Sequence, residues 1–291
     1  MTESAHTPLP TVAQALQQAA AQGLARIDAQ MLLLHCVGQG DAGRAWLLTH
    51  DNDALTPAQA AQWGQLLSRR LDGEPVAYLT GHKEFFGLSL QVDARVLDPR
   101  PDTETLVEWA LELLQPLSKP KVADLGTGSG AIALALQHQR PDAEVTAVDA
   151  SLDALAVASA NAQRLQLPVR FVHSSWLEQL EGLFDAIVTN PPYIREDDPH
   201  MPALHHEPRQ ALTSGEDGLD DIRAIAAQAP ARLTAGGWLL IEHGWDQAEA
   251  VAALLQTAGF TAVQHRHDLA GIVRCTAGQS PTAHSRVQTV K

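Results

Sequence analysis

The hydrophobic pattern of the first part of the chain is helical throughout. Apolar residues recur at helical spacing between short breaks, which predicts helices over residues 11–21, 28–37, 44–48 and 57–71. Thr56 followed by Pro57 is typical of a helix start, because proline is tolerated at the first helical position. No strand pattern occurs here, so we expect a small all-helical domain over residues 1–72. Such a domain is either a structural appendage or a module that binds a macromolecular substrate.

The pattern changes over residues 73–100, where glycine and proline separate short apolar pieces. Two of these pieces, residues 76–79 and 88–92, have the composition of β-strands. We therefore expect a β-hairpin linker over residues 73–100 that joins two domains.

From residue 101 onward, short apolar runs alternate with helical segments. Strands are expected over residues 121–124, 144–148, 169–172, 184–188 and 237–242, near 263 and over 271–275. Helices are expected over residues 105–114, 131–136, 153–165, 220–232 and 246–258. This alternation predicts a doubly wound α/β domain with a mostly parallel sheet over residues 101–278. The polar residues 279–291 are expected to form a disordered tail.

A glycine-rich turn joins the first expected strand of this domain to the next helix. Asp124 ends the strand, and the turn that follows contains Gly126, Thr127, Gly128, Ser129 and Gly130. Strand, glycine turn and helix in this order are typical of a nucleotide site, because the backbone can approach the ligand closely. Asp149 ends the next strand, where a carboxylate can accept hydrogen bonds from both hydroxyls of a ribose.

A stiff corner, Asn190-Pro191-Pro192-Tyr193, follows the expected strand 184–188. Proline has no N–H and a fixed φ, so the strand ends here, at the sheet edge where ligands bind. The side-chain oxygen of Asn190 and the carbonyl of Pro191 would then be two acceptors on a rigid frame. They match a planar –NH2 group, such as an amide or an exocyclic base amine, on which the ring of Tyr193 can lie. The alternative is a turn around a buried asparagine.

Two cofactors fit the glycine turn. Gly126, Gly128 and Ala131 satisfy the G-x-G-x-x-A form of the dinucleotide fingerprint, which favours NAD. S-adenosylmethionine also accounts for the additional Gly130 and for the corner, because hydride transfer has no use for a group that holds an amine. We therefore expect S-adenosylmethionine. Trp176, after the third strand, either covers the adenine or packs in the core.

Composition restricts the partners. The net charge is −14 and the pI is near 5.3, which argues against a surface built to hold nucleic acid phosphates. The chain has two cysteines and no apolar run as long as the ~18 residues of a membrane span, so we expect a cytoplasmic protein without a membrane partner. Two histidine groups, residues 205–206 and 265–267, lack a supporting second set of ligands, and no metal site is expected.

Taken together, these residues resemble the peptide chain release factor glutamine methyltransferases of the PrmC/HemK type. The resemblance runs from the helical domain to about residue 278. Its most specific parts are Gly73-Glu74-Pro75 with Tyr78, Glu84-Phe85-Phe86-Gly87, Pro99-Arg100-Pro101-Asp102-Thr103-Glu104, Asp124 to Gly130, Asn190 to Tyr193, Glu207-Pro208 with Ala211-Leu212, and Glu242-His243-Gly244.

The resemblance implies a class I methyltransferase fold and a helical domain that recognises the substrate. It implies transfer of a methyl group from S-adenosylmethionine to the side-chain nitrogen, N5, of the glutamine in the Gly-Gly-Gln motif of class 1 release factors. Matching positions imply cofactor binding by Gly126, Thr127, Gly128, Ser129, Gly130, Asp149, Trp176 and Asn190. They imply that Asn190, Pro191, Pro192 and Tyr193 bind the glutamine, and that Asn190, Pro191 and Tyr193 act in catalysis.

The chain departs from the family pattern at two positions, and other functions share parts of it. Ser175 stands where the family usually has aspartate, and Asp98 replaces an apolar residue. A sister group methylates a glutamine of a ribosomal protein and shares the corner, but residues 100–104 favour the release factor branch. Adenine N6 methyltransferases of nucleic acids also share the corner, and the acidic composition argues against them. A non-catalytic adaptor that binds the cofactor is disfavoured by the intact corner.

Overall fold

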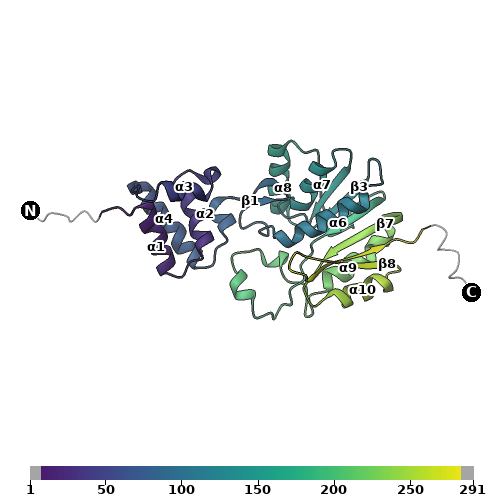
Figure 1. Ribbon diagram of the computed structural model, residues 1–291. Helices are drawn as coiled ribbons and strands as arrows, with labels where there is room; N and C mark the ends of the chain where they lie inside the picture. Colours follow the sequence, from purple (N-terminus) through teal and green to yellow (C-terminus); the bar gives the residue numbers. More distant parts are fainter. Residues whose placement is uncertain (1–7, 283–291) are drawn as a thin grey trace, which may run out of the picture. The chain divides into compact units, whose positions relative to one another are not determined.

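The computed structural model describes residues 8–282 and divides into two compact units between Gly81 and His82 (Figure 1). The first unit is helical, with α1 (Val12–Ala21), α2 (Arg26–Cys36), α3 (Arg44–Thr49), α4 (Pro57–Leu71) and α5 (Val76–Thr80). Thr11 and Thr56 each form a capping box with the glutamine three residues later, which satisfies the free N–H groups at the starts of α1 and α4. Its core includes the fully buried Leu32, Leu33 and Trp63.

The strand expected over residues 76–79 is wrong, because these residues form the short helix α5. Helical geometry buries Ala77 and Leu79 against the rest of this unit, where α5 contacts α2 and α4. Tertiary packing therefore overrides the weak β-propensity of the segment. The first unit consequently includes residues 73–81, which the sequence assigned to a linker.

The second unit begins with a hairpin, β1 (His82–Phe85) and β2 (Leu88–Gln91), whose second strand was predicted. Phe86 in its turn has φ of 50°, a left-handed conformation that is uncommon for a bulky residue. Two carboxylates stabilise this turn: the N–H of Phe86 donates to Glu104 Oε1 at 3.0 Å, and the N–H of Gly87 donates to Glu84 Oε1 at 2.7 Å.

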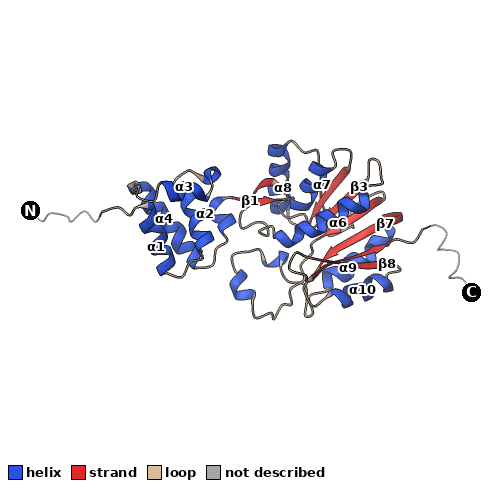
Figure 2. Ribbon diagram, viewed as in Figure 1, coloured by secondary structure: helices blue, strands red, loops and turns tan. Residues whose placement is uncertain are grey.

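A seven-stranded sheet forms the centre of the second unit (Figure 2), with the strand order β5-β4-β3-β6-β7-β9-β8. Its first five strands in the chain pair in parallel, and β9 is antiparallel to both β7 and β8. The strands are β3 (Lys121–Leu125), β4 (Glu144–Asp149), β5 (Arg170–His173), β6 (Phe184–Thr189), β7 (Leu233–Glu242), β8 (Thr261–His267) and β9 (Val273–Gln279). The predicted doubly wound, mostly parallel sheet is confirmed.

Helices cover both faces of this sheet (Figures 1 and 2), because its central strands are apolar on both sides. Helices α6 (Glu104–Leu114), α7 (Ala131–Gln139) and α8 (Leu152–Leu165) lie on one face, and α9 (Asp220–Gln228) and α10 (Ala248–Thr257) lie on the other. Ala123, Leu125, Ile187 and Ile241 share one buried cluster with residues of α9 and α10. Asp124, which alternates with Ala123 and Leu125, faces α7 instead.

The remaining expectations concern the chain ends and the membrane. The disordered tail expected over residues 279–291 falls mostly outside the described residues, and Gln279, where it was to begin, is the last residue of β9. Within residues 8–282, no helix combines the length and the apolar character that crossing a membrane requires.

A buried asparagine that the sequence did not indicate joins the hairpin to the glycine turn. Asn161 on α8 has no exposed surface. Its Oδ1 accepts from the Gln91 N–H at 2.7 Å, and its Nδ2 donates to the carbonyls of Gln91 at 2.9 Å and Ser129 at 3.0 Å. One side chain therefore satisfies backbone groups of β2 and of the glycine turn together.

We expect Asn161→Ala to lower the free energy of unfolding by about 2–4 kcal/mol, because it leaves several buried backbone groups unpaired. Urea unfolding of the full chain measures this loss. Gln163→Ala, an exposed change on the same helix, is the matched control. Equal stabilities of the two variants would contradict the role given to Asn161.

Candidate active site

A cavity of about 290 Å³ opens at the carboxyl ends of the parallel strands. Its walls include residues that follow four successive strands of the sheet: Gly126 after β3, Asp149 at the end of β4, Ser174 after β5 and Asn190 after β6. Strands β3 and β6 are neighbours, and the chain leaves them in opposite directions across the sheet. This is the switch point at which open α/β sheets bind ligands.

The glycine turn places backbone, rather than side chains, beside this cavity. Gly126 and Gly128 line it. Gly130 caps α7 with φ of 87°, a left-handed conformation that favours glycine, and a Cβ there would lie 2.9 Å from Leu134 Cδ1 and require that side chain to shift. Thr127 and Ser129 are buried and point into the fold: the hydroxyl of Thr127 donates to Asp124 Oδ2 at 2.6 Å.

Asp124 and Asp149 are the two carboxylates that organise the turn. Asp124 is fully buried, and its Oδ2 also accepts from the Ala133 N–H in the first turn of α7, at 3.1 Å. Burial raises the pKa of Asp124 to about 7, and its Oδ1 has no hydrogen-bond partner among the described residues. Asp149 lines the cavity and accepts from the N–H groups of Gly128 at 2.9 Å and Ser151 at 2.8 Å. Burial raises its pKa as well.

For Trp176, the sequence left open whether it covers the adenine or packs in the core, and its position is consistent with both. It lines the cavity, and it also packs against the buried cluster on the α9 and α10 face of the sheet. Its backbone φ of 48° is in the left-handed region, and its ring lies 3.4 Å from the position that a Cβ on Gly126 would take. The indole is therefore held in the wall by the fold.

Asn190 lies where two cavities adjoin. It lines the first cavity together with Pro192, and it lines a second cavity of about 230 Å³ together with Pro191 and Tyr193. The second cavity is bounded further by Arg100, Ile194, Leu204 and Leu212. A group in the first cavity and a group in the second can therefore approach each other at Asn190.

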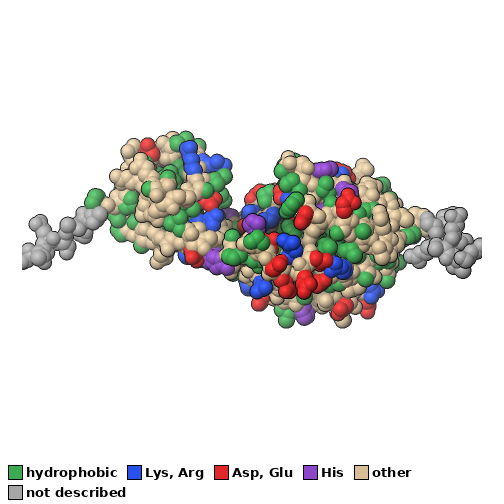
Figure 3. Space-filling view, turned by 90° about the horizontal axis from the view of Figure 1, so that it is seen from below, with side chains coloured by type: hydrophobic (Ala, Val, Ile, Leu, Met, Phe, Trp, Pro, Cys, Tyr) green, Lys and Arg blue, Asp and Glu red, His purple; other side chains and the backbone are tan. Residues whose placement is uncertain are grey.

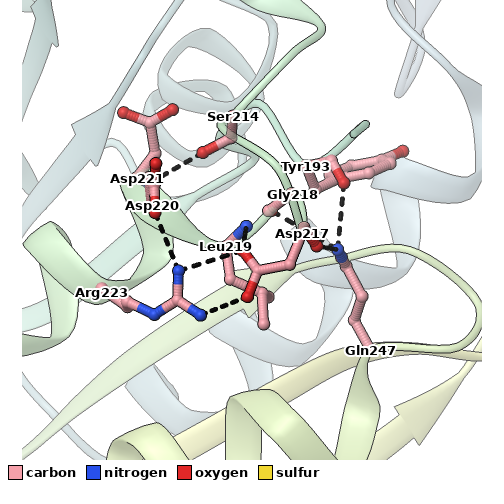
Figure 4. Close-up of polar contacts among 9 residues, drawn as sticks. All are labelled: Tyr193, Ser214, Asp217, Gly218, Leu219, Asp220, Asp221, Arg223 and Gln247. Atoms are coloured by element: carbon pink, nitrogen blue, oxygen red, sulfur yellow. Dashed lines mark hydrogen bonds and ion pairs between the residues drawn. The ribbon is translucent and has the colours of Figure 1, made fainter. Parts of the chain in front are cut away.

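Gln247 and Gly218, which the sequence did not indicate, contact the backbone of the corner at the Tyr193 carbonyl (Figure 4). Gln247 Nε2 donates to the Tyr193 carbonyl at 3.0 Å, as Figure 4 shows. Gln247 Oε1 accepts from the Gly244 N–H at 2.8 Å. Gly218 packs against the same carbonyl: its φ is 76°, and a Cβ there would lie 2.2 Å from Tyr193 O. Only glycine fits that position, so the backbone of the corner has little room to move.

The segment between the corner and α9 completes the walls. Pro208, Gln210 and Ala211 line the first cavity, as does Asp221 at the start of α9, whose N–H donates to Ser214 Oγ at 2.8 Å (Figure 4). The sequence pointed to this segment only through the family motif at residues 207–212. No sequence pattern indicated Asp221, because its place beside the cavity depends on how α9 packs against the sheet.

The two departures from the family pattern have different surroundings. Asp98 is buried and forms ion pairs with Lys83 at 3.3 Å and Arg100 at 3.4 Å, while Glu207 binds Arg100 at 2.5 Å and accepts from the Asp98 N–H at 3.3 Å. Lys83 and Arg100 thus compensate the charges of Asp98 and Glu207 together. Ser175 lines the first cavity beside Trp176 and presents a small hydroxymethyl group there.

The predicted site residues fall into three groups. Gly126, Gly128, Asp149, Trp176 and Asn190 meet around the first cavity, with Pro192. Pro191 and Tyr193 face the second cavity. Thr127, Ser129 and Gly130 support the turn from within rather than forming the cavity wall, so a direct cofactor contact by their side chains remains a prediction.

Comparisons with known proteins agree with this architecture. A family model described as the methyltransferase small domain matches residues 103–259, and the PrmC N-terminal domain matches residues 10–81. Among solved structures, a methyltransferase of Pyrococcus furiosus is similar with a TM-score of 0.52 and 18% identity, covering 75% of this chain and 99% of that one. A 16S rRNA methyltransferase of T. thermophilus, solved with AdoMet and guanosine, has a TM-score of 0.52 and 24% identity, covering 69% of this chain and 49% of that one. These likenesses show the fold.

Similar sequences cover nearly the whole chain. The release factor glutamine methyltransferase of Bordetella pertussis is 52% identical, over 88% of this chain and 95% of the relative. Those of Xylella fastidiosa, at 49%, and Escherichia coli, at 44%, cover 92% and 91% of this chain and 98% and 96% of their own lengths. At this identity and coverage, the chain belongs to the release factor glutamine methyltransferase family.

Proposed function

We propose that this protein transfers a methyl group from S-adenosylmethionine to the side-chain nitrogen, N5, of the Gly-Gly-Gln glutamine in class 1 peptide chain release factors. The observation that carries the proposal is the position of Asn190, which lines both adjoining cavities. The name shared by the relatives supports the choice of substrate.

The first cavity fits S-adenosylmethionine better than a dinucleotide. The N–H of Gly128, which a dinucleotide fingerprint would offer to a phosphate, is already donated to Asp149. Asp149 and Asp221 place carboxylates in the wall, while the one basic wall residue, Arg95, is paired with Asp93 at 2.6 Å. Such a wall favours a ligand that carries positive charge. We assign cofactor binding to Gly126, Gly128, Asp149 and Trp176, with the turn shaped by Thr127, Ser129 and Gly130.

The corner supplies positioning for a weak nucleophile. When bound, the cofactor supplies an electrophilic methyl group. An amide nitrogen reacts poorly because its lone pair is delocalised into the carbonyl, so its placement determines the rate. Asn190 Oδ1 and the Pro191 carbonyl accept the two N–H groups of the glutamine amide, and these acceptors favour the positive charge that develops on the nitrogen. Tyr193 and Pro192 border the amide plane.

Tyr193 acts in this site as a neutral side chain. Burial and the nearby Glu242 carboxylate raise the pKa of its phenol above its usual range. It therefore contributes a ring surface and an O–H donor rather than a base.

The surface is compatible with a protein substrate. Figure 3 shows acidic, basic and apolar side chains interspersed on the face of the second unit that it presents, and the net charge of the chain is −14. Neither feature favours binding to nucleic acid phosphates. Both cysteines, Cys36 and Cys275, are buried free thiols, which suits the reducing cytoplasm in which we place the protein.

Labelled cofactor and purified release factor test the proposal directly. Incubation with the full chain should transfer the label to the factor, and mass spectrometry of its peptides should locate the methyl group on the Gly-Gly-Gln glutamine. Labelling of a ribosomal protein, or of DNA or RNA, in place of the factor would assign a different substrate.

Asn190→Ala should lower kcat by roughly 10²–10³-fold at saturating cofactor, because one preorganised acceptor is removed from the site. Asn190→Asp keeps an acceptor and should retain more activity. Asn52→Ala, at an exposed site in the first unit, is the control. Near-normal turnover of a folded Asn190→Ala protein would refute the amide-positioning role.

Asp149→Ala should weaken cofactor binding by about 1.5–3 kcal/mol, the contribution of a hydrogen bond to a charged group. Calorimetric titration with cofactor measures the change, and a thermal melt confirms that the variant folds. The effect on kcat at saturating cofactor should be smaller than the effect on affinity. Unchanged affinity would remove Asp149 from the cofactor site.

We also propose that the first unit recognises the release factor. Each cavity described above is lined entirely by residues of the second unit, so removal of residues 1–81 should leave cofactor affinity within about twofold. Methylation of the intact factor should fall about tenfold or more, because a tethered binding module raises the local concentration of substrate. A truncated chain that binds cofactor and methylates the intact factor at the normal rate would exclude this role.

A further inference from the structure

Two turns at the carboxyl edge of the sheet expose large apolar side chains that the proposed reaction does not use. Trp245, in the turn between β7 and α10, is 72% exposed. In the turn between β8 and β9, Leu269 is fully exposed and Ile272 is 39% exposed. Single exposed apolar residues are common on protein surfaces, whereas several at one end of a sheet indicate an interaction surface. We call these three residues the apolar edge patch.

The pairing of the strands brings the two turns together. Strand β7 is parallel to β6, so it ends at the edge where the cavities open, and the antiparallel β9 begins there. Just beyond the end of β7, the N–H of His243 donates to the Arg274 carbonyl at 3.0 Å. Trp245 and Ile272 each lie two residues from this hydrogen bond, and two residues of chain span at most about 7 Å. The two turns are therefore neighbours.

Hydrogen bonds fix the turn that carries Leu269 and Ile272. Asp268 Oδ1 accepts from the N–H groups of Ala270 and Ile272, both at 2.9 Å. Asp268 Oδ2 accepts from Arg274 Nη2 at 3.2 Å, and the N–H of Asp268 donates to the Ile272 carbonyl at 2.8 Å. The turn thus presents Leu269 to solvent on a backbone that is already ordered, and such preorganisation lowers the entropy cost of binding.

The turn that carries Trp245 is bonded to the corner. Two hydrogen bonds close this turn: the N–H of Gln247 donates to the Gly244 carbonyl at 3.1 Å, and the N–H of Gly244 donates to Gln247 Oε1 at 2.8 Å. Gln247 Nε2 then donates to the carbonyl of Tyr193, a wall residue of the second cavity, at 3.0 Å (Figure 4). Trp245 is therefore two residues away from the side chain that holds this wall.

A protein that inserts a side chain into the second cavity must also cover the surface around it. A standard interface occupies roughly 800 Å² on each partner, which corresponds to a disc with a radius of about 16 Å. A disc of this size centred on Tyr193 includes the turn of Trp245, because Gln247 belongs to that turn and contacts Tyr193. Tryptophan is also enriched among the interface residues that contribute most to affinity. The position and the chemistry of the patch thus fit a protein substrate.

We propose that the apolar edge patch, Trp245, Leu269 and Ile272, is a docking surface for the release factor. Apolar side chains beside the glutamine-bearing loop of the factor pack against it. The inference deepens the proposed function and rests on it for the identity of the partner. The corner binds the substrate amide, whereas the patch binds the body of the protein that carries this amide, so the patch acts on affinity for the factor rather than on methyl transfer.

Titration of fluorescently labelled release factor with the full chain tests the docking surface, with the demethylated cofactor present to prevent transfer. Trp245→Ala and Leu269→Ala should each raise Kd about tenfold, because each removes an apolar contact with the factor. Trp245→Phe keeps an aromatic ring and should restore most of the loss. The matched control is Leu183→Ala, since Leu183 is 52% exposed and precedes β6, at the opposite edge of the sheet. Values of Kd equal to that of the control would overturn the proposal.

Steady-state kinetics separate docking from the reaction. Trp245→Ala and Leu269→Ala should raise KM for the intact factor about tenfold, while kcat and cofactor affinity stay within about twofold of wild type. A thermal melt checks that both variants fold. A lower kcat with an unchanged KM would contradict docking, because it would place these residues in the reaction itself.

The fluorescence of Trp245 reports on the patch without any methyl transfer. The tryptophans of the chain all lie within residues 8–282, and Trp245 alone among them is exposed. Acrylamide should therefore quench Trp245 in the free protein, and bound release factor should protect it. The difference between wild type and Trp245→Phe isolates this signal from the other tryptophans. Quenching of Trp245 that bound factor leaves unchanged would overturn the proposal.

These measurements distinguish failure of the inference from failure of the proposed function. If wild type transfers no methyl group to the factor, the proposed function fails, and the Kd values and the quenching alone judge the patch. Absence of binding, or binding that does not respond to Trp245→Ala, then overturns it. If transfer occurs and all variants match Leu183→Ala, the proposed function is retained and the patch is wrong. A dimer in size-exclusion chromatography that Trp245→Ala dissociates would assign the patch to a second copy of this chain and would also overturn the proposal.

Discussion

Pro191 and Pro192 impose the constraint on which the site depends, because neither can donate a hydrogen bond to continue strand β6. The chain must leave the sheet there, at the edge where β3 and β4 also end. Gln247 and Gly218 then hold the backbone of the corner from behind. In the reaction proposed above, Asn190 directs one oxygen toward the substrate, and the backbone that carries it is held on both sides. Preorganisation of this kind is how a protein activates a poor nucleophile without a strong base.

The parallel part of the sheet also determines why the site consists of two adjoining cavities. In the sheet, β4 and β5 lie on one side of β3, whereas β6 and β7 lie on its other side. The chain therefore leaves the strand ends in two directions, and loops from both halves surround a gap between them. The turn after β3 and Asp149 shape one compartment, and the corner with Leu204 and Leu212 shapes the other. The two share Leu97, Asn190 and Ala211 as common wall. In the proposed reaction, each compartment binds one reactant, and the two reactants meet at Asn190.

Sequence patterns predicted those features that depend on neighbours in the chain. The apolar runs that form β3, β4, β6 and β7, the glycine turn and the corner could all be recognised because each is local. Contacts between distant segments could not: Asn161 reaches Gln91, and Gln247 reaches Tyr193. The helix over residues 76–80 was misjudged for the same reason, since its burial against α2 and α4 decides its conformation. Glu242 was visible only as part of a family motif, and its burial beside Tyr193 depends on how distant strands pair in the fold.

The strand order carries a consequence for the growing chain during synthesis. Strand β7 pairs on one side with β6 and on the other with β9, which is made last and inserts between β7 and β8. Until residues 273–279 emerge, β7 presents an open edge, and β8 has no partner in the sheet at all. Glu242 lies opposite Cys275 in this late pairing, so the chain cannot complete the environment of that carboxylate before its final strand arrives. A nascent chain that ends before β9 already contains the glycine turn and the corner. It would nevertheless expose the edge of β7, which could pair with another chain.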